Sequence, residues 1–279
     1  MARKKNKREL YEESYKSRNH FSFGSNWKDF LRKLTPERMR LARKSLEEFL
    51  PADLSGKSFI DVGCGSGLFS LAAVRMGADV TSIDVDDSSL ECARYLKKKF
   101  AKGSSWKIEK ASALDARLRQ FEKFDVVYSW GVLHHTGYMT KAIRNVAGLV
   151  KKGGVFYIAI YNNNTRYPLE GSSKFWCFAK SVYNRSPPII KEAVYLAYTT
   201  YLLAGITASL RNPFSYIRNY KTVRGMDFFT DIKDWLGGYP YEYASADEMK
   251  RLFGRLGFTL VKEKRARSLG CNEFLFRKE

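Results

Sequence analysis

Seven residues between a predicted strand and a predicted helix restrict the fold of this chain more than any other segment. They read DVGCGSG (residues 61–67); an apolar run at 58–62 leads into them, and 68–76 has a helical pattern. Glycine lets a backbone turn sharply and approach a ligand closely, and the N-terminus of a following helix offers N–H groups and partial positive charge. The segment therefore predicts a strand–turn–helix unit whose turn binds a carboxylate or a phosphate.

Strands and helices alternate along most of the remaining sequence. Strand-like runs are separated by helical patterns, which predicts parallel β-α-β units with right-handed crossovers. The predicted strands are 58–62, 80–84, 106–110, 124–130, 154–161, 258–264 and 273–277. The last two are expected to form an antiparallel hairpin at the sheet edge, after a helix that begins with a capping box at Ser245 and Glu248. The predicted fold is an α/β, doubly wound, mostly parallel seven-stranded sheet.

The chain divides into four predicted parts. They are a tail with helices that cover the ligand site (1–57), the binding core (58–170), a helical insertion after the fifth strand (171–225), and a return to the core with the last helix and the edge hairpin (226–279). Within the first part, an amphipathic helix is expected around Trp27 and Phe30. A second helix is expected after Thr35 as N-cap, because Pro36 suits a first helical turn.

An acidic residue, Asp84, ends the predicted strand that follows the glycine segment. A carboxylate at that point of a β-α-β unit can accept hydrogen bonds from ribose hydroxyls. The glycine spacing is G-x-G-x-G, and Leu68 stands where a dinucleotide fingerprint has its third glycine. The glycine segment and Asp84 together predict a nucleoside-containing ligand rather than a purely structural turn.

Residues 58–162 resemble the core of the class I S-adenosylmethionine-dependent methyltransferases, nearest in type to the ubiquinone-biosynthesis O-methyltransferases. The matching segments are FIDVGCGSG, VTSIDVD, ASALD, FDVVYSWGVLHHT and LVKKGGVFYIAIYN, in that order. The resemblance implies S-adenosyl-L-methionine as the cofactor, and no metal site is predicted. The implied cofactor-binding residues are Asp61, Gly63 and Gly65 at the methionine part, Asp84 at the ribose, Ser112 and Ala113 at the adenine, and Trp130 after the fourth strand, together with Cys64 and Val85. Arg40, before the core, either pairs with the cofactor carboxylate or faces solvent.

Two adjacent histidines, His134 and His135, follow the fourth strand at the edge where open α/β sheets bind ligands. A phenol or alcohol acceptor must lose a proton, and histidine suits that role near neutral pH. One of the two is predicted to be the catalytic base, with no choice between them. The alternative is that they cap the next helix or pack against the cofactor. Tyr161 and Asn162, which end the fifth strand, are candidates for lining the acceptor pocket.

The insertion carries ten aromatic and eight basic residues but a single acid, Glu192, in a chain with a net charge of +20. Its uncharged run at 193–210 approaches transmembrane length. However, the strands on either side must join one sheet, and a single crossing would separate them by a bilayer. Two interpretations remain beside that of an ordinary helical cap: a roof over the acceptor pocket, or a basic, aromatic surface that lies on an anionic membrane. Both hold if the acceptor is lipid-linked.

The predicted function is methyl transfer to oxygen of a small-molecule, lipid-linked or glycan-linked acceptor. An RNA methyltransferase would suit the positive charge. However, Ser129-Trp130-Gly131-Val132 lacks the Asn/Asp-Pro-Pro-aromatic segment of enzymes that methylate base amino groups, so nucleic acid is not an expected partner. A noncatalytic cofactor-binding protein is the second alternative. Widely spaced cysteines and the absence of a secretory signal predict a cytoplasmic protein, peripheral at the membrane in the second interpretation of the insertion.

Overall fold

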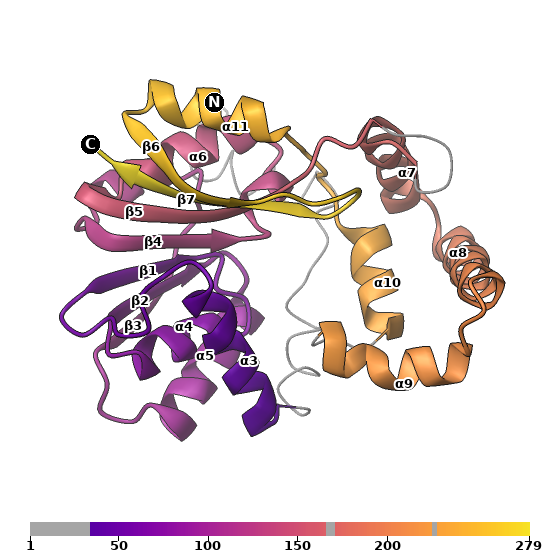
Figure 1. Ribbon diagram of the computed structural model, residues 1–279, viewed down its shortest axis with the longest axis horizontal. Helices are drawn as coiled ribbons and strands as arrows, with labels where there is room; N and C mark the ends of the chain where they lie inside the picture. The colour runs from indigo at the N-terminus through magenta and orange to yellow at the C-terminus, as the bar shows by residue number, and fades with distance from the viewer. Residues whose placement is uncertain (1–33, 166–170, 225–227) are drawn as a thin grey trace, which may run out of the picture. The chain divides into compact units, whose positions relative to one another are not determined.

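The computed structural model describes residues 34–165, 171–224 and 228–279 (Figure 1). The expected helix around Trp27 and Phe30 lies outside the described residues. Contacts between residues divide the described chain into two compact units. The sheet unit runs to Ser173 and resumes at Glu242–Glu279, and the helical unit is Lys174–Tyr241. The helical unit therefore extends beyond residue 225, where the insertion was predicted to end.

The sheet unit contains a seven-stranded sheet in the order β3-β2-β1-β4-β5-β7-β6. β1 to β5 are parallel, β7 runs antiparallel to β5, and β6 antiparallel to β7. The strands are β1 (Ser58–Val62), β2 (Asp79–Asp84), β3 (Trp106–Lys110), β4 (Phe124–Trp130), β5 (Val150–Tyr161), β6 (Phe258–Lys264) and β7 (Cys271–Lys278). The predicted doubly wound, mostly parallel sheet is confirmed, including the antiparallel hairpin at its edge.

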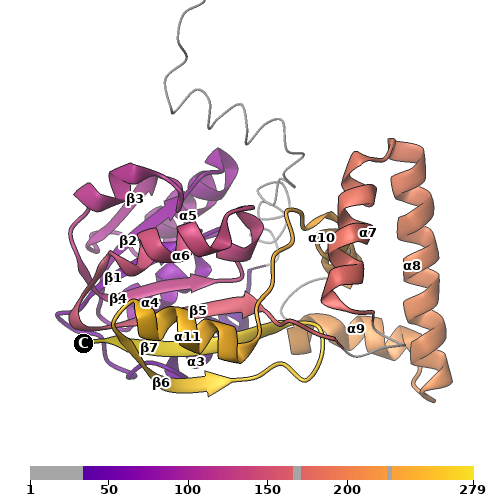
Figure 2. The ribbon, with the colours of Figure 1, turned by 90° about the horizontal axis from the view of Figure 1, so that it is seen from above.

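Helices cover both faces of this sheet. Figure 1 shows α3 (Pro36–Glu47), α4 (Leu68–Arg75) and α5 (Asp87–Phe100) on one side. α6 (Met139–Ala147) and α11 (Ala246–Arg255) lie on the other, the face seen in Figure 2. Adjacent residues of β5 point to opposite faces: Phe156 packs against Phe253 of α11, whereas Tyr157 stacks on Phe49 beyond α3. Both faces of the strand are therefore buried, which explains its continuous apolar run.

Two local expectations differ from the structure, both around β4 and β5. β5 begins at Val150 rather than at residue 154, and α6, which the sequence pattern predicts over 139–150, ends at Ala147. Val150 pairs with Phe124, and the register shifts before the next pair, so the residues between form an irregular segment inside one strand. Short 3-10 helices at Ala116–Gln120 and Leu133–His135 were not predicted, because segments this short have no hydrophobic period.

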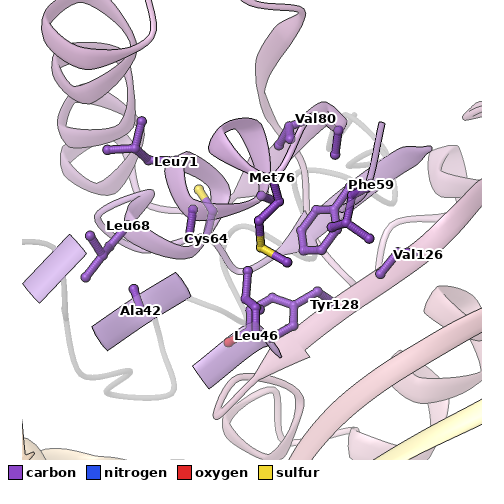
Figure 3. Close-up of a cluster of buried hydrophobic side chains, with 14 of the residues drawn as sticks. Ala42, Leu46, Phe59, Cys64, Leu68, Leu71, Met76, Val80, Val126 and Tyr128 are labelled. Atoms are coloured by element: carbon purple, nitrogen blue, oxygen red, sulfur yellow. The ribbon is translucent and has the colours of Figure 1, made fainter. Parts of the chain in front are cut away.

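Apolar side chains from α3, α4 and the sheet form one buried cluster (Figure 3). Leu46 of α3 and Leu71 of α4 are almost completely buried there, beside Phe59 of β1. Full burial of a leucine or phenylalanine contributes about 1.5–3 kcal/mol each. The predicted N-cap of α3 is confirmed, because the Thr35 side chain accepts a hydrogen bond from the Arg38 N–H. Packing by α3 thus fixes α4, the helix that begins at the glycine segment.

The helical unit consists of α7 (Ser173–Arg185), α8 (Pro188–Ala208), α9 (Pro213–Arg224) and α10 (Phe228–Gly237). In α8 only Thr199 is buried, although the helix is mostly apolar. Taken singly, no helix among the described residues has both the length and the apolar character to cross a membrane. α8 and the start of α9, bent by 113°, reach that length and composition only as a pair.

A buried lysine, Lys180 of α7, lies inside the helical unit. Its ammonium group donates a hydrogen bond to the Trp235 carbonyl and lies 3.9 Å from the centre of the Trp235 ring and 4.9 Å from that of Tyr241. Burial lowers the pKa of Lys180 to about 7, although the charge of nearby Asp234 acts in the opposite direction. The folded unit therefore holds an amine that loses its proton near neutral pH.

Because the pKa of Lys180 is lowered, we expect the stability of the folded protein to rise with pH. Between about pH 7 and pH 10 the unfolded chain binds a proton that folded Lys180 has lost, so the free energy of unfolding increases by up to about 1.4 kcal/mol per pH unit. Thermal unfolding followed by circular dichroism should show this gain for the native protein and its loss in Lys180→Met. Lys174→Met, at an exposed position on the same helix, should retain it. Parallel pH curves for the native protein and Lys180→Met would contradict the prediction.

Candidate functional site

The glycine segment forms a tight turn at the carboxyl end of β1. Gly63, Gly65 and Gly67 have φ values of 79°, 51° and 78°, a region that side chains disfavour. The N–H groups of Gly63 and Cys64 both donate to the carbonyl of Ile83 in β2, over 2.8 and 3.1 Å. The turn is therefore anchored to the neighbouring strand by its own backbone.

Close packing adds a second demand for glycine in this turn. A Cβ at Gly63 would lie 2.3 Å from the Val132 side chain, and a Cβ at Gly67 would lie 2.9 Å from the backbone of Ala93 in α5. The first contact brings the residues after β4 against the turn. The second holds α4 and α5 together where α4 begins.

Gly67→Ala should therefore cost more than its backbone conformation explains. Gly103 has nearly the same φ, 81°, but open space around it. Gly103→Ala should lower the free energy of unfolding by about 1–2 kcal/mol, the cost of a left-handed conformation. Gly67→Ala should lower it by about 2–4 kcal/mol, because crowding adds to that cost. Urea unfolding measures both changes, and equal losses would mean that the contact with Ala93 is relieved at no cost.

The carboxylate of Asp84, the last residue of β2, lies beside the turn. Its Oδ2 accepts a hydrogen bond from the Gly65 N–H and its Oδ1 from the Asp86 N–H, both at 2.9 Å. Partial burial raises the pKa of Asp84 despite these hydrogen bonds. A carboxylate can accept about four hydrogen bonds, so Asp84 retains capacity for another donor, and its side chain is partly exposed. Asp84 can thus accept hydrogen bonds from a ligand's hydroxyl groups while it holds the turn.

Asp61 lies beneath the turn, where it is only 2% exposed. Its Oδ2 accepts a hydrogen bond of 2.6 Å from the Ser70 hydroxyl of α4. Burial raises the pKa of Asp61 to about 7, and the negative charge of Asp84 acts in the same direction. This carboxyl group supports the turn from inside the protein.

The predicted adenine-side residues follow β3. The Ala111 N–H donates to the carbonyl of Asp84, which brings the end of β3 to the end of β2. Ser112 and Ala113 are both buried; the Ser112 hydroxyl accepts from the Leu114 N–H at 3.1 Å, and the Ala113 carbonyl accepts from the Asn145 side chain at 3.0 Å. The structure therefore gathers the glycine turn, Asp84 with the adjoining Val85, and Ser112 with Ala113 at the ends of three neighbouring strands.

Two other predicted cofactor residues lie in different surroundings. Arg40 is on an exposed face of α3, where its guanidinium forms two hydrogen bonds with Glu37 at 2.9 and 2.6 Å. The structure does not bring it to the turn, and its position matches the solvent-facing alternative. Trp130 ends β4 beside β1, is 43% exposed, and donates from its indole N–H to Glu273 of β7 at 3.1 Å.

The two histidines lie together but differ in environment. His134 is fully buried; its Nδ1 accepts a hydrogen bond of 3.1 Å from the Tyr161 N–H, and its carbonyl accepts one of 2.9 Å from the Glu242 N–H. Because Nδ1 is an acceptor, the neutral ring carries its proton on Nε2. His135 is partly exposed, with its ring centre 4.5 Å from that of His134 and 5.4 Å from that of Tyr161. His134 connects the segment after β4 to the end of β5 and to Glu242, whereas His135 is partly exposed.

The second predicted acceptor-pocket residue, Asn162, is held on both sides of its amide. Its Nδ2 donates to the Ser268 carbonyl at 3.0 Å, and its Oδ1 accepts from Asn272 at 2.9 Å. These bonds connect the residue after β5 to the β6–β7 connection and to the start of β7.

Two acidic residues at the carboxyl edge of the sheet, Glu242 and Glu273, were not predicted from the sequence. Both carboxylate oxygens of Glu242 accept the Met139 N–H at the start of α6, and burial raises the pKa of this carboxyl. Glu273 accepts from Trp130 and, at 2.5 Å, from the Tyr157 hydroxyl. Neither acid belongs to a motif, and each contacts residues more than 100 positions away, so no local signal could have identified it.

The helix start at the turn and the carboxylate beside it define a class of protein. α4 begins at the turn without a side-chain cap, so its first N–H groups suit a carboxylate. Asp84 beside the turn suits a ribose, and the two features match the two ends of an amino-acid nucleoside. Among the described residues, no cluster of three or more His, Cys, Asp or Glu side chains could hold a metal ion. The site is that of an α/β protein that binds a nucleoside cofactor.

The family model for the methyltransferase domain matches residues 34–263. The chain belongs to this family, and the resemblance predicted from the sequence is confirmed. S-adenosylmethionine is the cofactor of the family, and solved structures of magnesium protoporphyrin IX methyltransferase from Synechocystis PCC 6803 contain it as SAM or SAH. The predicted cofactor therefore agrees with the family, and the residues around the turn fit it.

Individual relatives share part of their length with this chain. A ubiquinone biosynthesis O-methyltransferase from Pelagibacter ubique is 28% identical over 141 residues, which cover 49% of this chain and 57% of that protein. A protein of the same name from Stutzerimonas stutzeri is 35% identical over 113 residues, 40% of this chain and 48% of that protein. The chain thus spans about half the length of these relatives.

Solved structures show the shared fold. The Synechocystis enzyme with bound SAH has a TM-score of 0.53 at 14% identity, covering 92% of this chain and 96% of that one. A cyclase, SpnF, also has a TM-score of 0.53, at 13% identity, covering 86% of this chain and 81% of that one. Because a cyclase shares the fold, the fold by itself does not determine the reaction.

Proposed function

We propose that this chain transfers the methyl group of S-adenosylmethionine to a hydroxyl oxygen of an apolar small molecule. The observation that carries the proposal is Asp84, whose carboxylate holds the glycine turn through Gly65 and keeps accepting capacity beside it. The match to the methyltransferase domain family supports it independently. Oxygen as the acceptor atom is supported by His135, a partly exposed base close to Tyr161 at the carboxyl edge of the sheet.

The residues of the chain have separate tasks in this proposal. S-adenosylmethionine supplies an electrophilic methyl group on a sulfonium. The glycine turn and Asp84 bind and orient the cofactor, since alignment of the two reactants is the main contribution a protein makes to such a transfer. The imidazole of His135 takes the acceptor's hydroxyl proton as the oxygen attacks. His134 connects its own segment to the end of β5 through the Tyr161 N–H and to the segment before α11 through the Glu242 N–H.

Cofactor binding and methyl transfer can be tested one after the other. Calorimetry with the purified protein should show binding of S-adenosylmethionine and of its thioether product. Release of that product should then depend on added phenols, and a phenol with a long alkyl tail should be a better acceptor than its short analogue. Binding with no turnover on any acceptor would favour the noncatalytic alternative. Methylation of RNA in preference to phenols would favour the nucleic-acid alternative.

We propose further that the helical unit lets the enzyme reach a lipid-linked acceptor at an anionic membrane surface. Leu210 between α8 and α9 is 97% exposed and has a φ of 57°, and Phe214 nearby is 83% exposed. A left-handed conformation costs a leucine about 1–2 kcal/mol, and strain of this kind often accompanies function. Exposed Arg211 and Arg218 flank these side chains with positive charge, which suits anionic headgroups.

Leu210→Gly is expected to increase the stability of the protein and to weaken its binding to vesicles. Glycine relieves the backbone strain, so the free energy of unfolding should rise by about 1 kcal/mol. The same change removes an apolar side chain, so binding to phosphatidylserine-containing vesicles should weaken about tenfold. Binding should also weaken with added salt and with neutral vesicles. Unchanged vesicle binding in the variant, or no binding by the native protein, would rule out this surface.

A further inference from the structure

A continuous chain of hydrogen bonds runs through the core to Asp61. The Trp106 indole N–H of β3 donates to the Ser82 hydroxyl of β2 at 2.7 Å, and Ser82 donates to the Ser70 hydroxyl of α4 at 2.7 Å. Ser70 in turn donates to Oδ2 of Asp61 in β1 at 2.6 Å. All four side chains are buried, with exposures of 2% or less. Such a network inside an apolar core has no water to replace a missing partner.

The direction of this chain is set at its far end. An indole N–H can only donate, so the Ser82 oxygen must accept from Trp106. Each serine hydroxyl has a single proton, and that proton is committed to the next oxygen. The last acceptor, Asp61, then receives a proton donor on Oδ2, and this arrangement favours the ionised carboxylate.

The surroundings of Asp61 work against ionisation. The other titratable groups that interact with it in the described structure are Asp84 at the end of β2, the Cys64 thiol of the turn and the Tyr128 phenol of β4, all of them acids. Burial and the charge of Asp84 raise the pKa of Asp61 to about 7. Within this set, the donated proton of Ser70 is the main contact that stabilises the carboxylate.

We propose that Trp106, Ser82 and Ser70 are positioning residues that favour the ionised form of Asp61 beneath the glycine turn. An anion at this place increases the affinity of the turn for a positively charged ligand. This inference rests on the proposed function for the identity of that ligand, a sulfonium that also carries an ammonium group. The hydrogen-bond chain itself is a property of the free protein.

Removal of the indole N–H allows the hydrogen bonds between Ser82, Ser70 and Asp61 to reverse their direction. In Trp106→Phe the Ser82 hydroxyl no longer has to accept at that side, so a protonated Asp61 can donate to Ser70 and Ser70 to Ser82. The carboxyl group should then ionise at higher pH than in the native protein. Because the ionised form binds a cation more tightly, the affinity for S-adenosylmethionine should fall at and below neutral pH and recover in base.

The expected effect is a displaced pH profile rather than a uniform loss. Calorimetric titration with S-adenosylmethionine should give an affinity about threefold to tenfold lower than native at pH 6.5 for Trp106→Phe and for Ser82→Ala, and within about twofold of native at pH 9. Asp61→Asn should remove the dependence on pH in this range. A loss that is the same at all pH values would indicate a merely structural role and overturn the proposal.

Ser129→Ala is a matched control elsewhere in the protein. Ser129 is also a fully buried serine on a strand next to β1, but its hydroxyl donates to the Val62 carbonyl outside the chain of hydrogen bonds. This variant should lose stability without displacing the pH profile. The same displacement in Ser129→Ala and Ser82→Ala would contradict the inference.

A measurement on the free protein separates this inference from the proposed function. NMR titration of carbon-13-labelled aspartate, with the Asp61 signal assigned by Asp61→Asn, should show ionisation about half a pH unit to one pH unit higher in Trp106→Phe. This readout requires no ligand. A displaced titration in a protein that does not bind S-adenosylmethionine would refute the proposed function alone, whereas an unmoved titration would refute the hydrogen-bond chain's role.

Discussion

His135→Ala should lower kcat by about a hundredfold to ten-thousandfold, the contribution of a positioned general base. The affinity for S-adenosylmethionine should stay within about twofold, because the proposal gives His135 no contact with the cofactor. Single-turnover kinetics with a saturating phenol acceptor measure the first quantity, and calorimetry measures the second. The pH dependence of kcat should flatten in the variant, since the titrating base is gone.

Variants of the neighbouring His134 are compared with His135→Ala. His134→Asn can keep an acceptor for the Tyr161 N–H, whereas His134→Ala cannot, so the alanine variant should be less stable and the asparagine variant should recover part of the loss. Neither should abolish the pH dependence of kcat. If His135→Ala reduces cofactor affinity as much as kcat, the histidine packs against the cofactor instead. If His134→Asn eliminates turnover while the protein stays folded, the two assignments must be exchanged.

Asp84→Ala should weaken S-adenosylmethionine binding by about tenfold to a hundredfold. That range corresponds to the 1.5–3 kcal/mol expected for hydrogen bonds to a charged acceptor. The Gly65 N–H also loses its partner, so the turn loses one of its anchors before the cofactor arrives. Asp84→Asn keeps one carbonyl oxygen and should bind with intermediate affinity.

A variant of the nearby Asp86 distinguishes an effect on cofactor binding from an effect on stability. The Asp86 carboxylate caps α5 by accepting from the Ser88 and Ser89 N–H groups at 2.8 and 3.1 Å. Asp86→Ala should lower the free energy of unfolding by about 1 kcal/mol, the usual value of a helix cap, and change cofactor affinity little. Unchanged calorimetric affinity in a folded Asp84→Ala protein would remove the ribose assignment.

Stability measurements on these variants must allow for two ionisable groups that folding perturbs in opposite ways. Lys180 loses its proton near neutral pH, so it makes the folded protein more stable as pH rises above 7. Asp61 has a raised pKa, so the folded state keeps a proton that the unfolded chain loses near pH 4, and the protein becomes less stable as pH rises from there to about 7. Comparisons at a single pH therefore need the native protein beside each variant.

The sequence alone determined the architecture and predicted where the cofactor site is proposed to lie. The alternation of strands and helices, the glycine turn with Asp84, the N-cap at Thr35 and the capping box at Ser245 are local patterns, and the structure contains each of them. Such features depend on hydrophobic period and backbone geometry over a few residues, and these can be read from neighbouring letters.

Only the tertiary structure decided how chemically similar residues differ. His134 and His135 are adjacent in the chain, but His134 is fully buried against Tyr161 and His135 is partly exposed. Trp106, Ser82, Ser70 and Asp61 come from four separate elements and form one network solely because those elements pack together. Burial and hydrogen-bond partners arise from contacts between distant segments, so the protonation and role of each group cannot be read from the residues beside it.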